Sequence, residues 1–151
     1  MSDQVSERIR IGATPARCWE IALDFEQYPN WVRDIKRATI LECDDEGRST
    51  RVEFRAAALG RSITYRLAYD FSDAPRSFSW KLVDGDLLRR LDGSYRFEAD
   101  GEATRVHYEL VADLKAPLPG VLVRRATSII MGSALRDLKQ HVEQLAGEAP
   151  T

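Results

Sequence analysis

Two hydrophobic periodicities divide the chain. Between about Ile35 and Leu114, apolar residues alternate with polar ones, which is the period of β-strands that bury one face. From Val121 to Leu145 apolar residues recur every three or four positions without a proline, and this spacing predicts one long amphipathic helix. Residues 5–13 alternate less regularly and predict a further strand at the start. The chain therefore reads as a strand, a connection, a run of strands and a long helix.

The alternating region predicts six strands joined by short turns. The segment "SITYRLAYDF" is the clearest, because Ile63, Tyr65, Leu67, Tyr69 and Phe71 all fall on one face. Turn sequences such as "DDEG", "SDAPR" and "VDGD" separate the segments, so we expect consecutive hairpins and an antiparallel sheet. The predicted strands span residues 35–43, 50–60, 62–71, 77–83, 87–99 and 104–114.

The connection after the first strand carries an unusual number of aromatic residues. Thr14 and Pro15 are typical of a helix start, and the stretch "DFEQYPNW" follows that short helix. It places Phe25, Tyr28 and Trp31 where a surface loop is normally polar. We therefore expect short helices here, with rings that point into the structure and close it like a lid.

The order of elements predicts the fold class. An antiparallel sheet with one apolar face must cover that face, and the C-terminal helix is the single predicted element long enough to do so. We expect an α+β helix-grip fold, in which a seven-stranded antiparallel sheet curves around the C-terminal helix and two short helices join strands one and two. Residues 1–146 would form one domain and 147–151 a disordered tail. A curved sheet cannot touch the helix along its whole length, which predicts a cavity between them.

Composition narrows the possible functions. The chain has 151 residues, of which 44% are apolar and 30% charged, with a formal net charge of −2, as in a single globular domain. That charge argues against nucleic acid as a partner. No signal sequence and no run of eighteen apolar residues is present, so we expect a cytoplasmic protein without stable membrane insertion. Cys18 and Cys43 are predicted to be free thiols, because their spacing fits neither a disulfide framework nor a zinc site.

No catalytic group is identified from the sequence. The serines lack a plausible histidine and aspartate partner, and His107 and His141 are predicted at the surface. The turn carboxylates show no paired arrangement for acid–base chemistry. We expect no metal and no cofactor, and a monomer or a weak dimer.

The inward positions of the predicted sheet and helix supply the candidate ligand-binding residues. The alternative for any single aromatic ring is core packing, but so many large rings with hydroxyl groups favour a partly wet pocket. Trp31 and Leu87 are predicted to line or gate one opening of this cavity, with Arg89 just inside unless a bulge at "LDG" turns it outward. Gly93 is expected to leave room on the inward face. The remaining candidates are Phe54, Tyr65, Leu67, Tyr69, Trp80, Tyr95, Tyr108, Leu122 and Ile129.

Four segments carry a resemblance to a known superfamily: "ATPARCWEIALDFEQYPNW", "GRSITYRLAYDF", "WKLVDGDLLRRLDGSYRF" and "PLPGVLVRR". From Val5 to Leu145 the chain resembles the START-like superfamily, also called SRPBCC or helix-grip proteins, and within it the bacterial polyketide cyclase/dehydrase and coenzyme Q-binding types. The resemblance implies an enclosed apolar cavity that binds lipids, isoprenoid quinones, polyketides or steroids. None of the segments is specific for a reaction.

Three functions follow from these observations. The first is a carrier of a hydrophobic small molecule, which the sequence favours over an enzyme. The second is a polyketide aromatase/cyclase, for which the resemblance implies a polar group, often an arginine, on the central strands. Arg66 has the outward parity, which counts against this chemistry, although Arg89 is a possible substitute. The third is a protein-interaction module. The sequence does not name the ligand.

Overall fold

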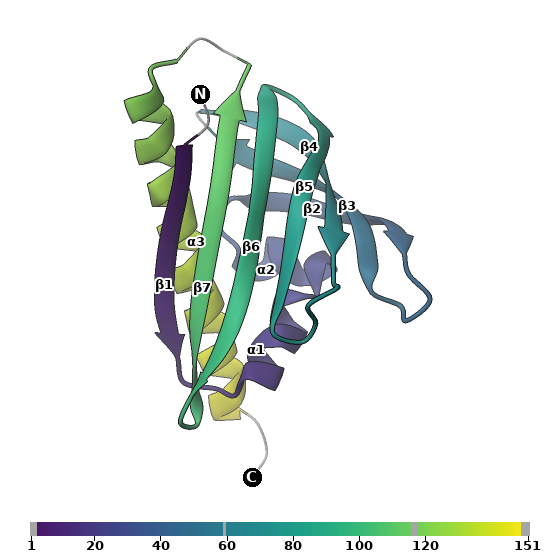
Figure 1. Cartoon of the computed structure of the whole chain (residues 1–151), viewed down its shortest axis with the longest axis vertical. Coiled ribbons are helices and arrows are strands. Elements are labelled where there is room, and N and C mark those ends of the chain that lie inside the picture. Colours follow the sequence, from purple (N-terminus) through teal and green to yellow (C-terminus); the bar gives the residue numbers. More distant parts are fainter. Residues whose placement is uncertain (1–2, 59, 116–117, 149–151) are drawn as a thin grey trace.

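The computed structural model describes residues 3–58, 60–115 and 118–148, and shows a curved antiparallel sheet with one long helix on its concave face (Figure 1). The strands of the sheet are β1 (Asp3–Ile11), β2 (Ile35–Cys43), β3 (Ser49–Ala58), β4 (Arg61–Asp70), β5 (Ser77–Gly85), β6 (Leu88–Asp100) and β7 (Ala103–Leu114). The helical elements are α1 (Pro15–Ala22), the 3-10 turn η1 (Phe25–Gln27), α2 (Tyr28–Trp31) and α3 (Gly120–Glu148).

The sheet has seven strands in the order β1-β7-β6-β5-β4-β3-β2. Strands β2 to β7 follow one another as hairpins, whereas β1 pairs with β7 in antiparallel register from Asp3 opposite Ala112 to Ile11 opposite Thr104. Strands β1 and β2 therefore form the two edges of the sheet. The short helices α1 and α2 carry the chain between these edges and cover one end of the concave face (Figure 1).

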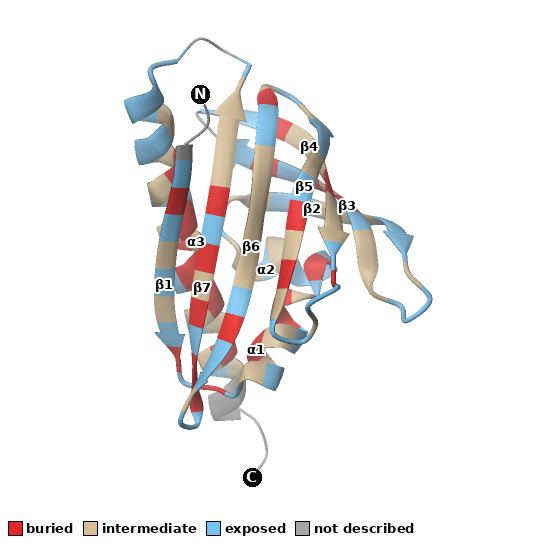
Figure 2. Ribbon diagram, viewed as in Figure 1, coloured by how far each residue is buried: buried red, intermediate tan, exposed pale blue. Residues whose placement is uncertain are grey.

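The C-terminal half of α3 packs into the main hydrophobic core. Met131, Leu135, Leu138 and Val142 recur every three or four residues, and each is at most 2% exposed. They form one cluster with residues of β1 and β7, which appear red in Figure 2. Burial of a side chain of this size stabilises a fold by roughly 1.5–3 kcal/mol. This half of the helix therefore anchors α3 to the sheet.

A polar clamp reinforces that anchor at the end of β1. The Glu143 carboxylate accepts a hydrogen bond from the backbone N–H of Gly12 at 2.7 Å and one from Lys139 Nζ at 2.8 Å. Lys139 Nζ also donates to the carbonyl of Arg10 at 2.7 Å. These bonds lower the pKa of Glu143, the contact with Lys139 being the main cause. The clamp fixes α3 against the C-terminal end of β1.

Strands β5 and β6 pair over a short length. Their register runs from Ser77 opposite Arg96 to Trp80 opposite Gly93. Beyond this point the backbone N–H of Leu82 donates to the carboxylate of Asp92, at 3.2 Å. At the other end of the pairing, the backbone N–H of Phe97 donates to the carbonyl of Arg76 at 2.8 Å. The sheet thus consists of two leaves, β1-β7-β6 and β5-β4-β3-β2, which are joined by four residue pairs and these two bonds in the described part of the chain.

The predicted fold class is confirmed, including the seven antiparallel strands and the long last helix. Helix α3 extends to Glu148, so residues 147 and 148 of the predicted tail are helical, and the rest of that tail lies outside the described residues. Cys18 and Cys43 are both free, the first buried and the second exposed. Among the helices described, none is both long and apolar enough to cross a membrane.

The expected space beside Gly93 is filled. A methyl group at Gly93 would lie 2.5 Å from Trp80 Cζ2 and 2.7 Å from the carbonyl oxygen of Glu109. The sequence prediction was wrong here because Trp80 is the cross-strand partner of Gly93, and its indole covers the glycine.

Candidate ligand-binding cavity

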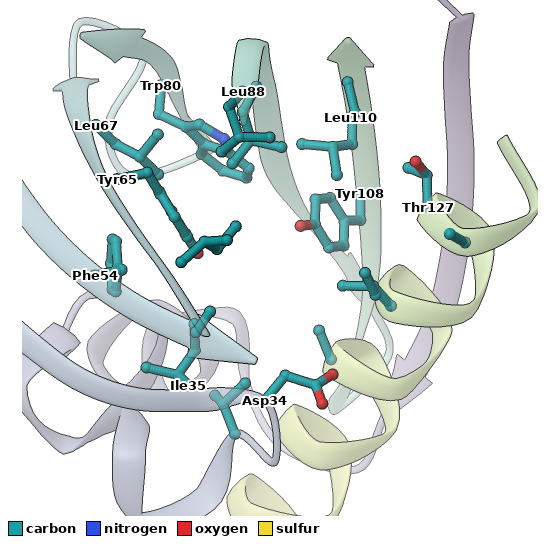
Figure 3. Close-up of a pocket in the computed structure, with 18 of the residues that line it drawn as sticks. Asp34, Ile35, Phe54, Tyr65, Leu67, Trp80, Leu88, Tyr108, Leu110 and Thr127 are labelled. Carbon is teal, nitrogen blue, oxygen red and sulfur yellow. The ribbon is translucent and has the colours of Figure 1, made fainter. Parts of the chain in front are cut away.

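A cavity of about 520 Å³ lies between the concave face of the sheet and α3 (Figure 3). This volume is within the range of roughly 300–1,000 Å³ that is typical of small-ligand sites. Strands β3 to β7 supply one wall, and α3 supplies the other from Leu122 to Leu138. Most of the lining side chains are aliphatic or aromatic, so the interior is largely apolar.

The strand and helix periodicities located this cavity well. Alternation along a strand sends every second side chain to the same face, and the curved sheet turns those faces toward one space. Whether these residues contact a ligand stays a prediction. The predicted residues that line the cavity are Trp31, Phe54, Tyr65, Leu67, Tyr69, Trp80, Leu87, Tyr95, Tyr108, Leu122 and Ile129.

Arg89 does not reach the cavity. Its side chain is 64% exposed, and its guanidinium lies 3.6 Å from the carboxylate of Asp113. The register between β6 and β7 shifts between Leu88 and Arg90, and such an irregularity reverses the side to which a residue points. Leu88 takes the inward place and is buried in the cavity wall. The prediction that Arg89 sits just inside the opening is therefore wrong.

The cavity is open to solvent along the N-terminal half of α3. Leu118, Leu122 and Ile129 belong to its lining, yet they are 43%, 51% and 64% exposed. The N-terminal half of α3 stands away from the sheet, whereas the C-terminal half is buried against it (Figure 2). The resemblance implied an enclosed cavity, whereas the structure shows a pocket that is open at this mouth.

Trp31 and Leu87 occupy opposite ends of the cavity. The carbonyl of Leu87 accepts a hydrogen bond from the backbone N–H of Lys115 at 2.7 Å, just before α3 begins. The Trp31 ring stacks on His141, with centroids 5.1 Å apart and an interplanar angle of 7°. His141 follows Leu122 by about five helical turns, or roughly 28 Å along the axis. The two residues therefore do not flank one opening. His141, predicted at the surface, is half-buried and packs on Trp31.

Hydroxyl groups are the main polar features of the wall. The hydroxyls of Tyr95 and Tyr108 share a hydrogen bond, and the Tyr28 hydroxyl donates to the carbonyl of Ala22. The Tyr65 side chain extends into the cavity in Figure 3. Burial raises the pKa of each of these tyrosines well above its ordinary value. They are therefore neutral hydrogen-bonding groups at physiological pH.

Two charged residues also line the cavity, and the sequence analysis did not select them. Asp34 immediately precedes β2, and its negative charge adds to burial in raising the pKa of Tyr65. Arg125 lies on the exposed part of α3 at the mouth. No sequence signal selects Asp34, because it lies outside a strand and strand parity does not apply to it. For Arg125 a signal exists, because the helical periodicity places it one turn beyond Val121, on the same face of α3.

Thr127 also lines the cavity, but its hydroxyl donates to the carbonyl of Val123 at 2.7 Å. Arg66 points outward, as predicted, and its guanidinium contacts Glu53 at 2.9 Å and Asp84 at 2.7 Å. Among the residues that the structure describes, no group of histidines, cysteines and carboxylates is arranged to hold a metal ion. The cavity is equipped to bind an apolar molecule that carries a few polar atoms.

Known structures share this architecture. A START superfamily protein from Mycobacterium smegmatis superposes with a TM-score of 0.89 at 24% sequence identity, covering 94% of this chain and 98% of the other. The ZhuI aromatase/cyclase from a Streptomyces species gives a TM-score of 0.82 at 16% identity, covering 95% of both chains. A protein from Thermus thermophilus gives a TM-score of 0.80 at 24% identity, covering 97% of this chain and 100% of the other. These similarities concern the fold.

A family model identifies the chain more directly. A comparison with curated proteins finds no significant match. Residues 2–143, however, match the model of the family described as polyketide cyclase/dehydrase and lipid transport. The match spans the whole sheet, the short helices and most of α3. The chain therefore belongs to the polyketide cyclase/dehydrase and lipid transport family.

Proposed function

We propose that this protein binds and carries a hydrophobic small molecule in the cavity between the sheet and α3. The observation that carries the proposal is the cavity itself, about 520 Å³ of space walled by aliphatic and aromatic side chains. Apolar side chains gain van der Waals contacts when apolar atoms pack against them, and a ligand in this cavity would supply such contacts.

The polar groups of the wall suggest what kind of molecule fits. Tyr65 offers a neutral hydroxyl in an otherwise apolar surrounding, and a buried neutral hydroxyl pairs well with a ligand carbonyl or hydroxyl. The Asp34 carboxylate adds a hydrogen-bond acceptor elsewhere in the lining. A ligand with a long apolar body and a few oxygen atoms matches this arrangement. Lipids, isoprenoid quinones and polyketide-like molecules all have these properties.

Ligand capture can be tested with an environment-sensitive apolar dye and with native mass spectrometry of freshly purified protein. Ala126 lines the cavity, and a tryptophan in its place would fill part of the volume. We expect Ala126→Trp to weaken dye binding by tenfold or more, corresponding to about 1.4 kcal/mol. Ala16→Trp is the matched control, because Ala16 is exposed on α1, outside the cavity.

The proposal fails if the unmodified protein binds neither dye nor a co-purifying ligand. It also fails if Ala126→Trp binds the dye as tightly as Ala16→Trp does. Thermal melting of both variants distinguishes a filled cavity from a damaged fold.

A second candidate is aromatase/cyclase activity on a poly-β-keto chain. The observation that favours it is that Asp34 and Tyr65 both line the cavity, so that a carboxylate and a neutral hydroxyl face the space that a poly-β-keto chain would occupy. Tyr65→Phe and Asp34→Asn should then abolish turnover of a poly-β-keto thioester analogue while dye binding persists. Absence of turnover by the unmodified protein would exclude this candidate for the analogue tested.

A further inference from the structure

The outer surface of α3 at the cavity mouth is unusually apolar. Val121 is 72% exposed, and Leu118, Leu122 and Ile129 are also well exposed. Residues spaced by three, four, seven and eight positions share one helical face, so Val121, Leu122 and Ile129 form a continuous patch. We call Leu118, Val121, Leu122, Arg124, Arg125 and Ile129 the mouth face.

This face is also basic, in contrast to the chain as a whole. The protein has 22 basic and 24 acidic residues, yet residues 120–136 contain three arginines and neither aspartate nor glutamate. Arg124 and Arg125 are exposed and form no ion pair with any residue that the structure describes. Lys115, just before α3, is exposed with its ammonium likewise unpaired within the described chain. Elsewhere many arginines are paired, for example Arg48 with Asp44.

We propose that the mouth face docks on an anionic lipid bilayer. Interleaved apolar and basic residues on one exposed helix face suit the bilayer interface, where apolar side chains enter the acyl region and arginines reach the phosphate groups. The interaction is peripheral, because no described helix is long and apolar enough to span a membrane. The inference rests on the proposed function, since it brings the cavity mouth to the surface from which an apolar ligand would come.

The charge of the mouth face argues against a second copy of the chain as its binding partner. A symmetric dimer through this face would bring both copies of Arg124 and Arg125 together, and residues 120–136 supply no carboxylate to neutralise them. The mouth face combines this apolar patch with arginines that form no ion pair within the described residues. A fluid, negatively charged surface satisfies both features at once.

The docking geometry has a direct consequence for ligand transfer. Leu122 and Ile129 belong both to the mouth face and to the cavity lining. Lipid tails that meet the mouth face would therefore already touch the cavity wall. A hydrophobic ligand would enter without crossing bulk water.

The experiment is co-sedimentation of the full chain with vesicles of phosphatidylcholine alone and of phosphatidylcholine with about 30% phosphatidylglycerol. We expect binding to the anionic vesicles at low ionic strength and its loss at about 0.5 M salt. Val121→Asp and the double variant Lys115→Glu/Arg124→Glu should each bind at least roughly fivefold more weakly. Neither set of residues lines the cavity, so dye binding in the absence of vesicles should be unchanged.

Matched controls are Leu41→Asp and Arg8→Glu, which alter exposed residues of β2 and β1, away from the mouth. The inference is overturned if the unmodified protein does not sediment with anionic vesicles, or if it binds both vesicle types equally. It is also overturned if light scattering shows a dimer that Val121→Asp dissolves, because the face would then join two copies. Vesicle binding and dye binding are measured separately, so docking can fail while the proposed carrier function stands.

Discussion

The two halves of α3 differ in almost every physical respect. From Met131 to Val142 the helix buries its apolar stripe completely and is clamped to β1 through Glu143. Between Val121 and Ile130 much of the apolar surface is exposed, and the remainder borders the cavity. The sequence pattern is similar in both halves, since apolar residues recur every three or four positions throughout. Amphipathic spacing therefore shows that a helix has an apolar side, but not what covers that side.

The contrast separates stability from function within one element. The buried half contributes the contacts that hold the helix to the sheet, while the open half offers surface to a ligand and, in our proposal, to a bilayer. Binding surfaces are drawn from the less stable parts of a structure because they must accommodate a partner. Substitutions in the buried half should therefore lower the stability of the fold, whereas substitutions in the open half should weaken binding and leave stability nearly unchanged.

The largest expected effect is a loss of stability in the buried half. Leu135 is 2% exposed and does not line the cavity, so Leu135→Ala should lower the free energy of unfolding by about 2–5 kcal/mol. Ile129→Ala, on the open half, should change it by less than about 0.5 kcal/mol. Urea unfolding followed by circular dichroism measures both values. Similar losses in the two variants would contradict the division of α3.

A second comparison concerns the two ends of the cavity. Trp31 packs edge-to-face against Tyr28 and stacks on His141 at the end of the cavity opposite Leu87, so Trp31→Ala should cost about 2–3 kcal/mol, less than for a fully buried tryptophan. Because Trp31 lies far from the mouth, the rate of ligand release should change little. Leu87→Ala, at the other end, should speed release while leaving stability nearly unchanged. Stopped-flow dye release and thermal melting separate these outcomes, and faster release from Trp31→Ala would identify a second entrance.

The smallest effect should come from the polar clamp. The pKa of Glu143 is lowered in the folded protein, so its stabilisation is present above the pKa of the unfolded state and is lost as pH falls through the folded value. Glu143→Gln should cost about 1 kcal/mol at about pH 7, and this cost should shrink as the pH falls through the folded pKa of Glu143. Glu26→Gln, at an exposed position of η1, serves as the control. A loss that does not depend on pH would assign the effect to packing.

Much of the architecture followed from the sequence because strand parity and turn residues are local signals. Tyr65 and Tyr108 were placed on the cavity face by alternation alone, and both line it. Arg89 was misplaced because the register shift beside it depends on how β6 pairs with β7. That pairing leaves no mark in the alternating pattern.

Other features depend on residues that are distant along the chain. Gly93 was expected to leave space, but its cross-strand partner Trp80 fills it. Trp31 was assigned to the mouth, although the tertiary fold brings it to His141. Asp34 was overlooked, because a residue before a strand carries no parity. The positions of Gly93 and Trp31 depend on contacts that a single sequence does not display.

The short junction between β5 and β6 gives the cavity a mechanical property. Four residue pairs, the Leu82–Asp92 bond and a backbone bond from the Phe97 N–H to the carbonyl of Arg76 join the two leaves of the sheet, whereas β6 and β7 pair along almost their entire length. A small rotation about this junction would spread the leaves without breaking another strand pair. The width of the cavity could then change with the size of the ligand. Because a bound ligand would hold the two leaves at one separation, we expect amide exchange in residues 81–85 to slow when a ligand is bound.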